Sequence, residues 1–221
     1  MAATMTLAEI RESVRTQLGD DEYDADVIDE AANWMQYQLF NDHRLRIAEE
    51  TDTISVSTGD SSADFPDDMM TLIYLGNGSA SILNDEIDYN LFMQDNPNWS
   101  SADSAVMGSW TRYGNGIRFA TPLSQAYTMP IDYLREPTLM EADDDECEIP
   151  ARYKEMFVKG TTIRVKEIDE DYDVAQADRD NLAPMITTFV RNEGRGGGKV
   201  GPTVMRTNRG RAGGYRADRD F

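Results

Sequence analysis

The feature that most limits how this sequence can fold is its last segment, which is rich in glycine and arginine. Residues 194–221 contain eight glycines, and a segment of this composition cannot form a packed core by itself. The core must therefore come from the preceding part of the chain. We expect residues 194–221 to be an extended tail that becomes ordered only on a partner.

The tail and the rest of the chain carry opposite charge. Residues 191–221 hold eight basic and three acidic residues, a net charge of +5. Residues 1–190 hold 13 basic and 38 acidic residues, a net charge of −25. Because nucleic-acid affinity rests on cations that neutralise phosphates, we expect this acidic body to repel DNA and RNA. A simpler interpretation, that acidity serves solubility, stays open.

The pattern at the start predicts a helical hairpin over residues 1–42. Thr6 and Glu9 have the spacing of a capping box, and apolar residues follow at helical spacing until Gly19. An acidic turn from Asp20 to Asp24 precedes a second helix. The predicted apolar face of that helix consists of Val27, Ile28, Ala31, Met35 and Leu39.

From residue 43 to 140 the pattern changes to the alternation typical of strands. Asn115 between Gly114 and Gly116 marks a tight hairpin turn. Pro130 cannot donate to a ladder, so its strand is expected at a sheet edge or at a bulge. We predict a small antiparallel β domain with strands at residues 51–58, 69–75, 79–83, 109–113, 117–120 and 127–134.

Residues 141–193 return to a helical pattern after an acidic connector, Glu141 to Glu148. Pro150 suits the first turn of a helix, and Asp169 to Asp173 are expected to interrupt or cap it. Pro184 is expected to kink the following helix or to start a new segment. The predicted fold class is α+β: a helical bundle of residues 1–42 and 141–193, an inserted β domain at 43–140, and an extended tail at 194–221.

Residues suited to catalysis or metal binding are few. His43 is the only histidine, so neither a multi-histidine metal site nor an assured nucleophile–histidine pair is expected. We interpret it as a cation at a helix end. Cys147 is surrounded in sequence by carboxylates, which raise the pKa of a thiol. The Asp20–Asp29 run lacks the glycine and final glutamate of a calcium loop. We predict no enzyme, no cofactor and no metal.

The sequence shows no recognisable signal peptide or membrane span. Residues 1–13 show neither the basic nor the apolar region of a signal peptide. No stretch approaches the ~20 apolar residues of a membrane span. We therefore expect a chain made in a cytoplasm, without a membrane partner.

The basic tail supports two hypotheses. Its arginine–glycine repeats resemble segments that bind RNA through cations and stacking. Alternatively, it is a docking arm that orders along an acidic groove of a neighbouring subunit. We favour docking, because RNA held by the tail would face a body of net negative charge.

The order of elements resembles that of tailed-bacteriophage head-to-tail adaptor proteins over about residues 5–192. The resemblance begins with the capped helix, the acidic turn and the second helix. Its other features are the Phe65–Met69 strand entry, the Gly114–Gly116 hairpin, the Ile131–Pro137 segment, and Ile149-Pro150 with Tyr153.

The resemblance implies a structural role at the head–tail interface of a virion. Such proteins form a homo-oligomeric ring, typically dodecameric, that joins the portal protein to a downstream tail or head-completion protein and extends the DNA channel. In this family the C-terminal segment commonly inserts into the portal. The residues expected to dock on the portal are Arg195, Lys199, Arg206, Arg209, Arg211, Tyr215, Arg216 and Phe221.

An acidic lumen would let double-stranded DNA pass without sequence-specific binding, because carboxylates repel phosphates. If the late helices face the lumen, the expected lining is Glu167, Asp169, Glu170, Asp171 and Asp173. Three alternatives stay open: a tail-tube terminator or nozzle ring of the same virion, a hydrolytic enzyme with a carboxylate pair, and an RNA-binding protein that uses the tail.

Overall fold

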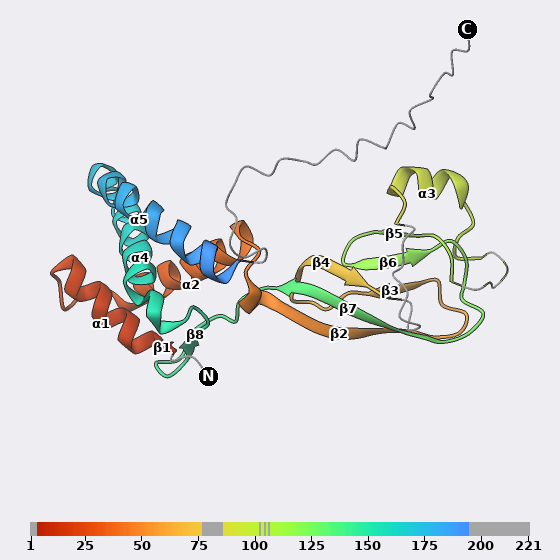
Figure 1. The fold of residues 1–221 in the computed structure, drawn as a ribbon, viewed down its shortest axis with the longest axis horizontal. Helices are drawn as coiled ribbons and strands as arrows, with labels where there is room; N and C mark the ends of the chain where they lie inside the picture. The colour runs from red at the N-terminus through yellow and green to blue at the C-terminus, as the bar shows by residue number, and fades with distance from the viewer. Residues whose placement is uncertain (1–3, 77–85, 102, 104, 106, 195–221) are drawn as a thin grey trace, which may run out of the picture.

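The computed structural model describes residues 4–76, 86–101, 103, 105 and 107–194. The helices of residues 7–42 and 154–193 gather at one end of the molecule, whereas the helix of residues 89–95 and most of the strands lie at the other (Figure 1). The described part contains five α-helices and three small antiparallel sheets, in agreement with the predicted α+β class. The residues of the portal-docking prediction lie outside the described part of the chain.

The helices and strands are numbered in chain order. The α-helices are α1 (Leu7–Leu18), α2 (Ala25–Asp42), α3 (Tyr89–Asp95), α4 (Lys154–Ile168) and α5 (Tyr172–Glu193), and the short 3-10 helices are η1 (Arg46–Ala48) and η2 (Ala151–Tyr153). The strands are β1 (Met5–Thr6), β2 (Glu49–Val56), β3 (Ser62–Asp64), β4 (Met69–Leu75), β5 (Trp110–Arg112), β6 (Gly116–Phe119), β7 (Tyr127–Arg135) and β8 (Glu146–Cys147).

Helix α4 is the centre of a bundle in which it packs against α1, α2 and α5. The start of α1 is the predicted capping box: the Glu9 amide donates to Thr6 Oγ1 over 3.3 Å, and the Thr6 amide donates to Glu9 Oε2 over 3.4 Å. Gly19 ends the helix in the left-handed conformation, with φ of 73°. Segments from both ends of the described chain therefore share one apolar core.

The buried face of α2 differs in part from the prediction. Ile28, Met35 and Leu39 are buried as expected, whereas Val27 is only partly buried and Phe40 lies inside. Helix α5 continues through Pro184 without starting a new segment. Pro184 and Asp180 are both exposed, so water can satisfy the carbonyl that loses its helical partner.

The longest sheet has the strand order β2–β7–β4, and it runs out from the helical bundle (Figure 1). Strand β7 is central, so the expectation of a sheet edge at Pro130 is wrong. The expected bulge is not at Pro130 either, because the irregularities in the β4–β7 pairing lie between Met69 and Thr71 and between Leu72 and Tyr74. The Pro130 carbonyl accepts from the Gly76 amide over 2.8 Å, just beyond the last residue of β4. The N–H and C=O of one strand residue point to the same neighbouring strand. The N–H that Pro130 lacks would therefore face the chain just after β4, beyond the last pair of the β4–β7 ladder.

A second sheet, of order β3–β6–β5, forms the far part of the β half. Its β5–β6 hairpin turns at Gly114, whose φ is 60°, as the sequence predicted. Strand β3 was not predicted, and the strand expected at residues 79–83 lies outside the described residues. Ile54, Val56, Phe119 and other apolar residues form a second core between these strands.

Strands β2 and β7 connect the two cores. They pair without interruption from Glu49 opposite Leu134 to Val56 opposite Tyr127. Leu134 packs into the helical core, whereas Met129 and Ile131 of the same strand pack into the β core. Within the described ranges, none of the helices combines the length and apolar character needed to cross a bilayer.

Candidate functional site: an acidic end of the helical bundle

The turn between α4 and α5 has a defined hydrogen-bonded geometry. The Asp171 amide donates to the Lys166 carbonyl over 2.8 Å, and the Glu170 amide donates to the Glu167 carbonyl over 3.2 Å. Glu170 has φ of 64°, in the position that glycine usually occupies in this type of helix end. The main chain thus fixes the direction of the carboxylates that follow α4.

Tyr23 joins this turn to the turn between α1 and α2. Its hydroxyl donates to both carboxylate oxygens of Asp169, each at 2.9 Å. Arg15 holds the Tyr23 main chain from the other side, because its Nε and Nη2 donate to the Tyr23 carbonyl over 3.0 and 2.7 Å. Burial of the ring, followed by the bond to Asp169, raises the pKa of Tyr23 to about 12.

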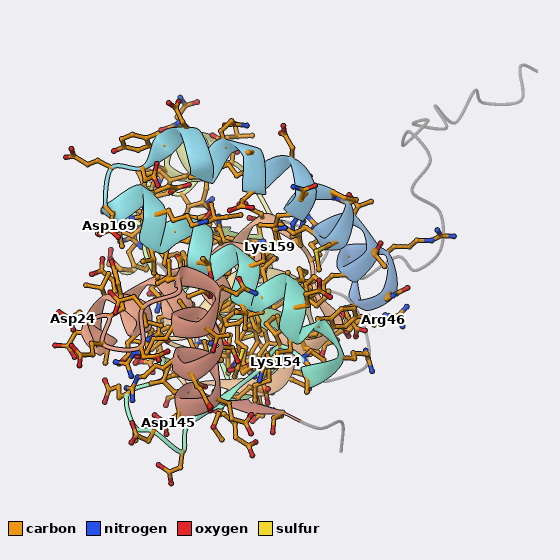
Figure 2. All side chains as sticks on the ribbon, turned by 90° about the vertical axis from the view of Figure 1, so that its left-hand side faces the viewer. Asp24, Arg46, Asp145, Lys154, Lys159 and Asp169 are labelled. Carbon is orange, nitrogen blue, oxygen red and sulfur yellow. The ribbon has the colours of Figure 1, made fainter. Side chains whose placement is uncertain are left out.

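The two turns together form a surface that we name the acidic end. Figure 2 shows Asp24 and Asp169 on the same side of the bundle. All of its carboxylates belong to exposed residues: Asp20, Asp21, Glu22, Asp24, Asp26, Asp169, Glu170, Asp171 and Asp173. Such a surface repels phosphate groups. Among the residues that the structure describes, no group of three or more acids, histidines or cysteines is arranged to hold a metal ion.

The structure brings four of the five predicted lining residues together and sets the fifth apart. Asp169, Glu170, Asp171 and Asp173 lie at the acidic end. The Glu167 side chain is only 10% exposed, and it pairs with Arg164 at 3.3 Å and with Arg179. Its charge is therefore largely compensated within the bundle. The sequence showed the acidic turn at residues 20–24, but nothing in it indicated that this turn adjoins the α4–α5 turn.

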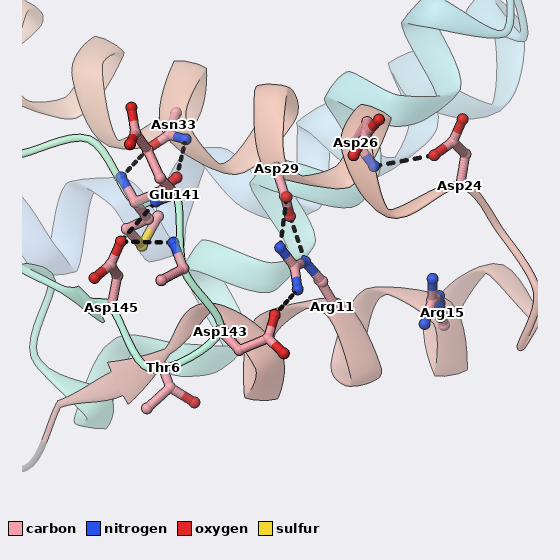
Figure 3. A network of polar contacts seen from close by, with 12 residues as sticks. Thr6, Arg11, Arg15, Asp24, Asp26, Asp29, Asn33, Glu141, Asp143 and Asp145 are labelled. Atoms are coloured by element: carbon pink, nitrogen blue, oxygen red, sulfur yellow. Dashed lines mark hydrogen bonds and ion pairs between the residues drawn. The ribbon is translucent and has the colours of Figure 1, made fainter.

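The acidic connector between β7 and η2 is bound tightly to α1 and α2 (Figure 3). Arg11 donates to the two carboxylate oxygens of Asp29 over 2.6 Å each, and it also pairs with Asp143. The hydrogen bond to Asp29 is the main reason why the pKa of Arg11 is raised. The Asp145 carboxylate accepts from the amides of Ala142 and Glu141, which lowers its pKa.

Two amide side chains of α2 complete this attachment. Asn33 and the Met140 main chain exchange two hydrogen bonds of 2.9 Å. Gln36, which is 1% exposed, donates to the Thr138 carbonyl over 2.9 Å and accepts from the Glu148 amide over 3.0 Å. The connector therefore has a structural role, and much of its acidity is used within the fold.

His43 and Cys147 both lie in structural surroundings. His43 is the residue that follows the last turn of α2, and burial lowers its pKa. The sequence interpretation of His43 as a cation at a helix end is therefore not favoured at neutral pH. Cys147 is fully buried and donates its thiol to Gln36 over 3.2 Å. Burial raises the pKa of this thiol to about 12, which suppresses the nucleophilic thiolate.

The end of α5 fixes the point from which the tail leaves the fold. Glu193 pairs with Arg152 and accepts from the Tyr153 hydroxyl over 2.8 Å. The next residue, Gly194, forms an antiparallel bridge with Leu45. The acidic end and this exit point lie at opposite ends of α5, a helix about 33 Å long at 1.5 Å per residue.

Comparison with known proteins supplies the family. A search of curated proteins gave no match. Residues 5–202 match the family described as SU10 adaptor protein, a span that covers the whole helical bundle, all three β sheets and the beginning of the tail. The chain therefore belongs to the SU10 adaptor protein family, a family of bacteriophage head–tail adaptors.

Proposed function

We propose that this chain is the repeating subunit of a dodecameric ring that joins the portal protein to a downstream tail or head-completion protein. The family match over residues 5–202 is the observation that carries the proposal. The subunit is made in the host cytoplasm and ends in the virion, at the head–tail junction. Residues 1–42 and 141–193 act as the ring-forming bundle, residues 43–140 as the inserted unit, and residues 194–221 as the docking arm.

The tail docks on the portal in this proposal. Its charge of +5 is opposite to that of the body, and the contacts of Glu193 and Gly194 give it a fixed point of departure. The contact residues are Arg195, Lys199, Arg206, Arg209, Arg211, Tyr215, Arg216 and Phe221. A segment that orders on binding can cover a large surface at moderate affinity, as an assembly step requires.

The acidic end faces the DNA channel. Asp169, Glu170, Asp171 and Asp173 repel the phosphates of passing DNA, so that the genome slides without adhering. The neighbouring carboxylates at residues 20–26 add to the same negative electrostatic potential and so to the repulsion of phosphates. Glu167 contributes less than its position suggests, because Arg164 and Arg179 compensate its charge.

Binding to portal-containing heads that lack tails tests the docking step. We expect saturable binding of the full chain and its loss when Arg209, Arg211 and Arg216 of the tail are changed to glutamine. The matched control makes the same change at three exposed arginines that precede the tail at residues 194–221, namely Arg44, Arg46 and Arg191. Binding by the control but not by the tail variant supports docking through the tail. No binding by the unaltered chain would overturn the portal assignment and direct attention to a ring on the tail tube.

DNA binding by assembled rings tests the channel. Neutralising Asp169, Glu170, Asp171 and Asp173 to their amides should increase the affinity of the ring for DNA, with a steep dependence on salt. The control neutralises four exposed carboxylates of the β half, Asp60, Asp67, Asp95 and Asp103. An equal effect of both changes would contradict a lumenal position of the acidic end.

A further inference from the structure

A groove of about 170 Å³ lies between α2, α4 and α5. Its floor is apolar and includes Leu39, Ile163, Leu182 and Ile186, while Trp34, which is 37% exposed, stands at one end. Along α2 the groove reaches from Trp34 to His43, a length of about 14 Å at 1.5 Å per residue.

We propose that this groove binds residues 199–205 of the same chain in the free subunit. The proposal concerns the subunit before assembly, and it does not depend on what the distal tail binds. Residues 209–221 remain available to a partner.

The position of the tail exit supports this occupant. Gly194 pairs with Leu45, which lies two residues beyond His43 at the near end of the groove. A bridge of ~5 Å between Cα atoms and two extended residues of ~3.3 Å each place the exit within roughly 12 Å of that end. Four or five extended residues after Gly194 are enough to enter the groove.

The sequence after Gly194 matches the groove in length and polarity. Val200, Val204 and Met205 are the first apolar side chains of the tail after its glycines. From Val200 to Met205 an extended chain spans about 17 Å, close to the length of the groove. Pro202 favours an extended conformation of the residue before it. The family match also includes the first part of this segment, because it continues to residue 202.

The charged residues at the rim of the groove fit a tail that enters the groove beside His43 and runs toward Trp34. Asp42 lies at the near end and, within the described part of the chain, forms no ion pair; Lys199 would reach it first. At the far end, Glu167 already pairs with Arg164 and Arg179. Arg206 therefore passes beyond the groove instead of being held inside it.

A spin label on the tail tests the occupant directly in the full chain. The label is attached at Thr203→Cys, which leaves all three apolar side chains in place. Cys147 does not compete for the reagent, because it is 0% exposed and its thiol pKa is raised to about 12. Methionine methyl groups are observed by NMR: Met35 lines the groove, and Met129 of the β core is the internal control.

The expected result is loss of the Met35 signal, its recovery when the label is reduced, and no change at Met129. A label at Arg219→Cys should leave both signals intact. Adding Ile186→Glu to the Thr203→Cys chain should restore the Met35 signal while the Met129 signal shows that the chain is folded.

Three results would overturn the proposal. The first is an unchanged Met35 signal with the label at residue 203. The second is an equal loss from the label at residue 219, which would indicate non-specific collapse of the tail. The third is loss of the signal in a mixture where label and isotope are on different chains, which would make a second copy the occupant.

Discussion

Replacing Gln36 with leucine should destabilise the helical half of the molecule by about 2–3 kcal/mol. The side chain is 1% exposed and spans the gap between α2 and the acidic connector. Its amide donates to the Thr138 carbonyl, and its carbonyl oxygen accepts from the Glu148 amide. Leucine fills a similar volume, so a cavity contributes little to the cost.

The magnitude follows mainly from these two hydrogen bonds, because the third partner of Gln36, the Cys147 thiol, is a weak donor. Each contributes about 1 kcal/mol net, and an unpaired buried donor costs about 1–3 kcal/mol. Thr138 is exposed, so water can replace the bond to its carbonyl at small cost. The Glu148 amide is partly buried, so we expect it to carry most of the loss.

Urea unfolding followed by far-UV circular dichroism measures the effect, with the dependence on denaturant unchanged. The matched control is Gln38→Leu on the same helix, where the side chain is partly exposed and makes no hydrogen bond within the described residues. We expect a change within about 0.5 kcal/mol there. If both variants unfold at the same urea concentration, the hydrogen bonds of Gln36 do not hold the connector in place and the reasoning is refuted.

Two further predictions concern the acidic end. Glu170→Gly should stabilise the fold by about 0.5–1 kcal/mol, because glycine adopts the left-handed conformation without strain. Asp171→Gly, at a residue with φ of −88°, should not do so; thermal unfolding of both variants checks this. Burial and the bond to Asp169 raise the pKa of Tyr23 from 10.0 to about 12 in the folded chain, so the neutral, buried phenol stabilises the fold fully below pH 10. That contribution is lost as the pH rises from 10 to 12, and Tyr23→Phe should remove this part of the alkaline destabilisation in urea titrations.

Local sequence signals predicted the elements whose causes are local. The capping box of Thr6 and Glu9, the left-handed Gly19 and the turn at Gly114 all occur as expected, because each depends on a few neighbouring residues. The alternation that buries Ile54 and Val56 is also local. Amphipathic spacing identified most of the buried face of α2, although the predicted face did not include Phe40, which is buried.

The features that sequence reasoning missed depend on contacts between distant segments. Strand β3 has the residues Ser62, Ala63 and Asp64, which carry no strand signal, and it exists because it pairs with β6. Pro130 occupies a central strand because β4 ends beside it. The Tyr23–Asp169 bond joins residues 146 positions apart. No periodicity in a single sequence encodes such a pairing, so the acidic end as a surface was not foreseen.

The insertion of the β half between α2 and α4 has a consequence for synthesis on the ribosome. The apolar face of α2 is covered mainly by α4, but residues 43–153 are translated between these two helices. At ~5–20 residues per second, this delay lasts roughly 5 to 20 seconds. During that time Ile28, Met35 and Leu39 lack the helix that covers them in the folded chain. Chaperones that bind nascent chains should therefore engage the first helical hairpin, and they should release it when α4 emerges.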